Sequence, residues 1–165
     1  MLLSPIGVPL TLMQLAVLPS HKIPVALIVN NFLLGTAVYS ADRLNDTSTV
    51  AELWECRSCA VASMLIYASR VNTIWLVPVV WALHCAYADM KPYIGEIKPF
   101  FVSLFWTVAV YFAPLSWSSE AGDIFTPAAF FLHIAALSHA ADVKDRKEDL
   151  VDNIRTPAVI LGGDL

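Results

Sequence analysis

Long stretches without a charged residue most constrain what this chain can fold into. Lys22 is the only charged residue among the first 41. Further uncharged runs cover residues 71–88, 99–119 and 124–141. Each is about 18 residues or longer, close to the roughly 20 apolar residues that cross the ~30 Å hydrocarbon core of a bilayer. The repetition of such runs predicts a chain that crosses a membrane several times.

The composition favours the same environment. Hydrophobic residues make up 58% of the chain and charged residues only 15%, whereas an average globular chain carries about 25% charged residues. A soluble core this apolar would lack the polar surface needed to cover it. We therefore expect an integral, multi-pass membrane protein that is surrounded by a lipid bilayer. We expect no nucleic-acid partner.

We predict an all-α fold, a polytopic membrane helix bundle that forms a single domain over residues 1–165. Its six apolar helices are expected at residues 2–19, 23–41, 53–69, 71–88, 99–115 and 124–141. The segments that connect these helices alternate between the two sides of the membrane. The side on which the chain begins receives eight lysine and arginine residues, and the other side receives two. The positive-inside rule places the side on which the chain begins in the cytoplasm or its organellar equivalent.

Two clusters of aspartates are expected to emerge on that side. Asp42 and Asp46 are four residues apart, and Asp142, Asp145 and Asp149 follow a spacing that shares one helical face. Like charges at these spacings destabilise a helix by a few tenths of a kcal/mol per pair. A divalent cation between the clusters would make them favourable, because Mg²⁺ prefers hard oxygen ligands and is held by carboxylates together with substrate phosphates.

Basic residues near both clusters could neutralise phosphate charge. They are Arg43, Lys98, Lys144, Arg146 and Arg155. A solvated loop of mixed charge explains the same pattern, so the spacing alone leaves both interpretations open. His139 shares the face of Asp142 and could contact a substrate, but we interpret it as a structural histidine whose hydrogen bonds are satisfied. The Cys56–Cys59 pair has no second pair of ligands, so it indicates a zinc site only weakly.

The second cluster resembles a motif of the UbiA superfamily of membrane prenyltransferases. That family carries an acidic DxxDxxxD pattern, which "DVKDRKED" matches at Asp142, Asp145 and Asp149. A turn and an apolar run ending in glycine follow, here "NIRTPAVILG". The matching positions of this tail are Ile154, Arg155, Thr156 and Gly162. Asn153 stands where the family usually has glycine, a mild change because asparagine tolerates left-handed backbone.

The first cluster resembles the family's other motif less closely. The family usually shows NDxxDxxxD, and the chain has "VYSADRLND". Asp42 and Asp46 match, whereas Val38 and Tyr39 replace the leading asparagine and aspartate. A phenol can still hydrogen-bond a phosphate oxygen, so Tyr39 is expected to keep a binding role.

The resemblance implies a nine-helix bundle, of which this chain carries about the first six helices. Either the chain is a shortened form or a protein partner supplies the remainder. The implied function is Mg²⁺-dependent transfer of an isoprenoid chain from an allylic prenyl diphosphate to an aromatic or other lipophilic acceptor. The implied catalytic residues are Asp42, Asp46, Asp142 and Asp145. The implied metal ligands are these four and Asp149. The implied substrate-binding residues are Tyr39, Arg43, Lys98, Lys144 and Arg155. Asn31 is a further candidate because polar groups inside the membrane are often functional, although hydrogen bonding between helices explains it as well.

Two other functions remain open. The chain could be a non-catalytic relative that binds a lipid diphosphate or a partner subunit, which the changed first motif and the expected missing helices favour. It could also be a small transporter or channel. A transporter predicts charged residues inside the membrane spans, and outside the first turns of the helix at 53–69 the predicted helices hold none.

Overall fold

The computed structural model describes residues 7–18, 20, 22–47, 50–82, 93–151 and 153–162. Within these ranges, side chains are described except at residues 39–47, 50–53 and 56. All the secondary structure in the described part is helical, which confirms the all-α prediction. The contacts divide the chain into two compact units, Met1–Ala88 with Val110–Ala121 and Asp89–Ala109 with Gly122–Leu165. A single domain over residues 1–165 stays a prediction.

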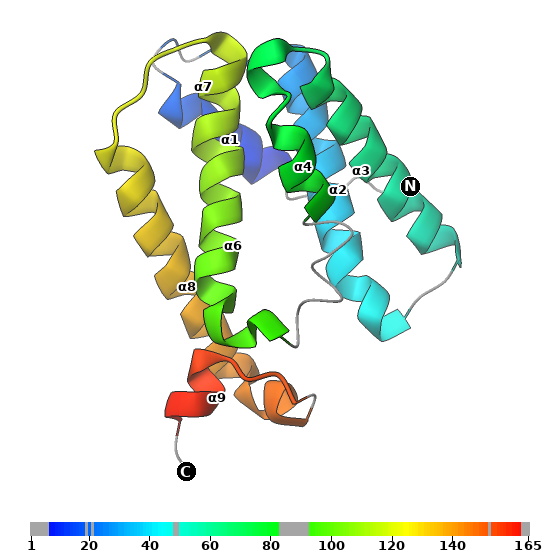
Figure 1. Cartoon of the computed structure of the whole chain (residues 1–165), viewed down its shortest axis with the longest axis vertical. Coiled ribbons are helices and arrows are strands. Elements are labelled where there is room, and N and C mark those ends of the chain that lie inside the picture. The colour runs from blue at the N-terminus through cyan, green and yellow to red at the C-terminus, as the bar shows by residue number, and fades with distance from the viewer. Residues whose placement is uncertain are drawn as a thin grey trace. The chain divides into compact units, whose positions relative to one another are not determined.

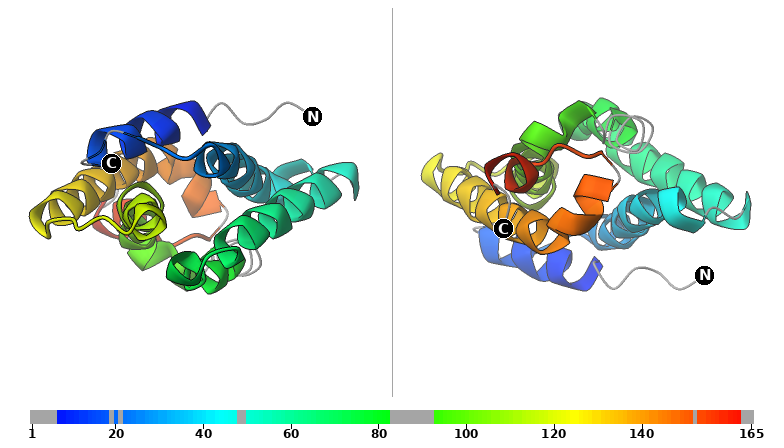
Figure 2. Two further views of the ribbon diagram at one scale, coloured as in Figure 1. Left: turned by 90° about the horizontal axis from the view of Figure 1, so that it is seen from above. Right: turned by 90° about the horizontal axis from the view of Figure 1, so that it is seen from below.

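The first unit is built around a pair of long helices. Its helices include α1 (Gly7–Val17), α2 (Val25–Thr47) and α3 (Val50–Ala68). Helix α2 packs against both α1 and α3, and the α2–α3 pair is visible in Figures 1 and 2. Leu33 and Ala37 of α2 contact a patch of α3 formed by Cys59, Ala60 and Met64. Small residues at this contact let two helix backbones approach closely.

Shorter elements complete the first unit. They are the 3₁₀ turn η1 (Val71–Thr73), α4 (Leu76–Trp81) and α7 (Ala113–Ser118). Helix α3 packs against α4, and α7 contacts η1. Arg70 joins this second contact: its guanidinium lies 4.7 Å from the centre of the Trp117 ring. A cation over an indole face is attracted by the ring quadrupole, so the pair fixes α7 against the end of α3.

The second unit contains a helix pair and a short C-terminal helix. Its elements are η3 (Gly95–Ile97), α6 (Lys98–Thr107), α8 (Phe125–Val151) and α9 (Pro157–Leu161). Helix α6 packs along α8, and α9 folds back to contact both α8 and η3 (Figure 2). The rings of Phe100 and Phe131 stack between α6 and α8 with their centroids 6.3 Å apart.

Prolines determine where two of these helices begin. Pro99 and Pro157 stand at the first or second position of α6 and α9. A proline is tolerated there because the first turn of a helix has no carbonyl partner for its backbone N–H. A π-helical turn, η4 (Val108–Phe112), lies between α6 and α7. Pro114 explains it, because the proline ring cannot pack against the preceding turn of a regular α-helix.

The observed helices differ from the predicted ones at two important ends. Helix α2 continues past residue 41 to Thr47, and α8 continues past residue 141 to Val151. Both acidic motifs therefore lie on helices rather than in loops. In the described part, the segment Gly95–Ser118 is the one helix long and apolar enough to cross a membrane. The bundle of about six membrane spans stays a prediction.

Candidate functional site

The second acidic motif occupies the last turns of α8, and its aspartates point in different directions. The Asp142 side chain is only 2% exposed, Asp149 is buried, and Asp145 is exposed. A helix turns about 100° per residue, so positions seven apart nearly coincide in direction, whereas positions three apart differ by about 60°. Asp142 and Asp149 therefore share a buried face, and Asp145 stands outside it.

Asp142 pairs with a lysine from the neighbouring helix. The ammonium Nζ of Lys98, the first residue of α6, lies 2.6 Å from Asp142 Oδ1 and donates a hydrogen bond to it. The other carboxylate oxygen, Oδ2, is buried and accepts no hydrogen bond from the described residues. A buried acceptor without a donor costs about 1–3 kcal/mol. The carboxylate is thus neutralised by one ion pair and still has an oxygen able to bind another group.

Asp149 is held by the turn that follows α8. The hydroxyl of Thr156 donates to Asp149 Oδ2 at 3.3 Å, and the backbone N–H of Ile154 donates to the carbonyl oxygen of Asp149 at 2.8 Å. Asn153 makes the turn possible with a left-handed φ of 56°. This conformation confirms that Asn153 adopts the left-handed backbone that asparagine tolerates. Thr156 also accepts a hydrogen bond from the N–H of Val159 and so caps α9.

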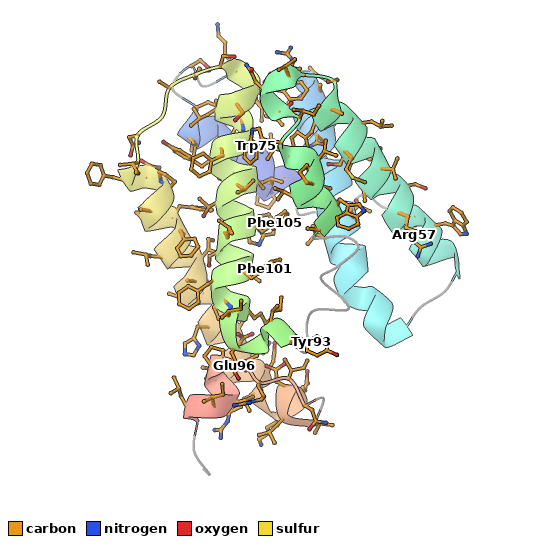
Figure 3. All side chains as sticks on the ribbon, viewed as in Figure 1. Arg57, Trp75, Tyr93, Glu96, Phe101 and Phe105 are labelled. Carbon is orange, nitrogen blue, oxygen red and sulfur yellow. The ribbon has the colours of Figure 1, made fainter. Side chains whose placement is uncertain are left out.

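The same turn packs tightly against η3. A Cβ atom on Gly95 would lie 2.9 Å from the carbonyl oxygen of Arg155, so no side chain fits there without a shift of backbone. Beside this contact, Arg155 forms an ion pair with Glu96 of η3 at 3.4 Å, and Figure 3 labels Glu96. Both side chains are more than half exposed. An exposed pair of this kind contributes little to stability.

The other predicted substrate-binding residues are placed as follows. Lys144 is exposed on α8. The side chains of Tyr39, Asp42, Arg43 and Asp46 lie outside the described residues, although α2 runs through all four positions. Asn31 is fully buried and exchanges two hydrogen bonds with Gln14, at 3.0 and 2.7 Å. Its amide also donates to Thr11 at 3.1 Å, so contact between Asn31 and a substrate would break this network.

His139 differs from the sequence-based interpretation. Its Nδ1 atom is buried and has no hydrogen-bond partner among the described residues. The spacing of three residues between His139 and Asp142 is visible in the sequence, and it places both on neighbouring positions of one helix face. The spacing gives no sign that the imidazole would lack a partner, because that depends on residues that α8 meets only in the folded chain.

The fit of Mg²⁺ to these residues depends on Asp142. Its buried Oδ2 is a hard oxygen ligand without a partner in the described part, which is the kind of atom that Mg²⁺ binds. Among the described side chains, no three histidines, cysteines or acidic residues are grouped closely enough to hold a metal ion. The described residues therefore fit a metal that takes one protein carboxylate here and fills its other positions with water or phosphate oxygens.

Comparison of the chain with protein-family models, curated proteins and solved structures found no match.

Proposed function

We propose that this chain is a membrane prenyltransferase of the UbiA type, which uses Mg²⁺ to transfer an isoprenoid chain from an allylic prenyl diphosphate to a lipophilic acceptor. The proposal rests on the acidic motif and its turn, together with one structural observation. That observation is the buried carboxylate of Asp142, which has one oxygen paired with Lys98 and one without a hydrogen-bond partner in the described part. Buried polar atoms without partners are rare and often belong to functional sites.

The α6–α8 pair that holds Asp142 also carries aromatic and exposed apolar residues along its length. Lys98 and Asp142 provide the charges at one end of α6. Phe100 and Phe131 stack between α6 and α8 and offer aromatic ring faces, which attract a cation. Six exposed residues on α6 and α8 add apolar surface that a bilayer or an isoprenoid chain would cover. They are Phe100, Leu104, Leu132, Leu137, Val143 and Leu150.

In the proposed reaction, the bond between the allylic carbon and the diphosphate oxygen breaks, and diphosphate leaves with the electron pair. An electron-rich carbon of the acceptor then bonds to the allylic carbon and loses its proton. A bound magnesium ion would supply charge stabilisation for the departing diphosphate. Asp142 would be a ligand of that ion, and Lys98 would offset negative charge on the leaving group. Roles for Asp42 and Asp46 remain predictions from the sequence.

A second function has its own support. Asp145 is exposed, and Asp149 already accepts a hydrogen bond from Thr156. The described side chains therefore bring fewer carboxylates together in one place than the motif suggests. These observations favour a non-catalytic relative that binds a lipid diphosphate, or that acts as a subunit of a partner, without transferring the isoprenoid chain.

A transfer assay in membranes tests the first function. Membranes that contain the full chain are incubated with Mg²⁺, radiolabelled prenyl diphosphates and aromatic acceptors. We expect labelled product from the wild type and a loss of at least about 100-fold in the Asp142→Ala variant, because charge stabilisation of the leaving group is lost. The Glu148→Ala variant is the matched control, since Glu148 is an exposed acidic residue of the same helix, and its rate should be unchanged.

Absence of product with every donor and acceptor would contradict the transferase function. Binding of the same labelled diphosphates, measured by filtration of the membranes, then tests the second function. Saturable binding that Asp142→Ala weakens supports a diphosphate-binding protein. Absence of both binding and transfer would contradict both functions.

A further inference from the structure

Lys98 occupies a position that is unfavourable for a cation. It is the first residue of α6, a helix of ten residues. The positive end of the helix dipole lies there, and it disfavours a nearby lysine while favouring a bound anion. The ammonium instead contacts the buried carboxylate of Asp142 on α8. The ion pair with Asp142 on the neighbouring helix therefore explains this position of Lys98. The dipole of its own helix does not.

The two members of this ion pair differ in freedom. The Lys98 side chain is 17% exposed and the Asp142 side chain 2%. Lysine carries its charge on a flexible four-carbon stem, so its ammonium can move to another acceptor without a change in the backbone. Asp142 has a short side chain on the buried face of α8. If the pair separates, Lys98 is the member that moves.

We propose that Lys98 is an exchangeable counter-ion of Asp142, which it neutralises only while no metal diphosphate is bound. When the metal and diphosphate arrive, Lys98 transfers to a phosphate oxygen, and Asp142 binds the metal. This inference rests on the proposed function, because it assumes a metal diphosphate as the ligand. Every buried charge has an opposite charge beside it both before and after the exchange, so neither state leaves Asp142 unneutralised.

The exchange makes the metal and Lys98 competitors for one carboxylate. A divalent cation at Oδ2 would stand close to the ammonium that already contacts Oδ1, and like charges at short range repel strongly in a poorly solvated place. Metal alone should therefore bind weakly. Diphosphate removes the competition by attracting Lys98, so metal and diphosphate should each raise the affinity for the other by the same factor.

Metal binding to the purified full chain in detergent tests this exchange. The rise of the thermal unfolding midpoint with Mg²⁺ concentration gives an apparent affinity, first with Mg²⁺ alone and then with inorganic diphosphate present. We expect Lys98→Gln to bind Mg²⁺ alone about tenfold more tightly than the wild type, within the usual range of coupling between sites. Inorganic diphosphate should raise the Mg²⁺ affinity of the wild type and should have much less effect on this variant.

Lys147→Gln is the matched control, because Lys147 is an exposed lysine on α8. It removes the same charge from the second unit and should leave the affinity within about twofold of the wild type, as expected for a screened surface charge. An equal gain in both variants would show a general charge effect and overturn the exchange. Unchanged or weaker Mg²⁺ binding in Lys98→Gln would also overturn it.

Lys98→Arg keeps the test decisive if Lys98→Gln does not fold. A guanidinium can hold both oxygens of a carboxylate in a bidentate pair, so this variant should bind Mg²⁺ more weakly than the wild type. Equal or tighter binding would contradict the competition. The outcome of this test is independent of catalysis. If Lys98 and Mg²⁺ compete but no prenyl transfer is found, only the transferase function is rejected. If prenyl transfer is found but Lys98 and Mg²⁺ do not compete, only the exchange is rejected.

Discussion

Buried polar pairs join neighbouring helices in both units of the chain. Gln14 of α1 and Asn31 of α2 are fully buried neutral amides that exchange two hydrogen bonds. Lys98 of α6 and Asp142 of α8 are charged and share one hydrogen bond of 2.6 Å. The Asn31 amide group is saturated by Gln14 and Thr11, whereas Asp142 keeps a buried oxygen without a partner in the described part.

The difference lies in how completely the hydrogen-bonding groups of each pair are satisfied. A polar network whose members are satisfied fixes the helices in one arrangement. An unsatisfied buried atom costs stability and requires another explanation, such as a ligand. Asn31 and Lys98 were both expected to bind substrate on the basis of the sequence. The hydrogen bonds with Gln14 give Asn31 a structural explanation, and substrate binding by Lys98 stays a prediction.

The largest effect on stability is expected from removing the charge on Lys98. Lys98→Met leaves the buried carboxylate of Asp142 uncompensated, which should lower the free energy of unfolding by about 3–5 kcal/mol. Chemical unfolding of the full chain in mild detergent measures it. The double variant Lys98→Met with Asp142→Leu should recover most of this loss, because no buried charge remains. If the double variant were as unstable as Lys98→Met alone, the loss of stability would come from altered packing and not from an uncompensated charge.

An intermediate effect is expected from the neutral pair. Asn31→Leu leaves the buried amide of Gln14 without these two hydrogen bonds and should lower the free energy of unfolding by about 1–2 kcal/mol. The same unfolding experiment compares it with Lys98→Met. Gln14→Leu combined with Asn31→Leu should recover part of the loss. If Asn31→Leu proved as costly as Lys98→Met, the contrast between a charged and a neutral pair would be lost.

The smallest effect is expected at an exposed polar contact, the cap of α8. Asp123 accepts hydrogen bonds from the backbone N–H and the hydroxyl of Thr126, at 2.7 and 2.8 Å. These bonds hold the pKa of Asp123 below its ordinary value of 3.8. Because the folded-state pKa is lowered, the stabilisation is fully present above pH 3.8 and is lost as the pH falls below it towards the folded-state value.

Asp123→Asn keeps a capping side chain but cannot titrate. Thermal unfolding between pH 6 and about pH 3 should show less loss of stability in this variant than in the wild type, because the Asp123 contribution is absent. Two identical pH profiles would show that the cap contributes nothing measurable. A pH dependence as large as the effect of Lys98→Met would contradict the ranking of exposed and buried contacts.

Part of the candidate site could be predicted from the sequence. The spacing of the three aspartates predicted a shared helical face, and α8 does run through all three positions. The resemblance, not the spacing, placed Asn153 at a turn, and its φ of 56° shows the left-handed backbone that asparagine tolerates. The spacing could not exclude Asp145 from the buried face. Positions three residues apart differ by about 60° in direction. This difference becomes important only when another element covers one of the two positions.

The sequence by itself determined that the described chain is helical and where many helices begin. Backbone hydrogen bonds close within a helix, so long apolar runs and prolines in first turns suffice. Only the tertiary structure decided which polar atoms are satisfied. Lys98 and Asp142 are 44 residues apart, and the sequence marked each as a site residue without pairing them. Their contact, and the oxygen that it leaves without a partner, exist because α6 packs along α8.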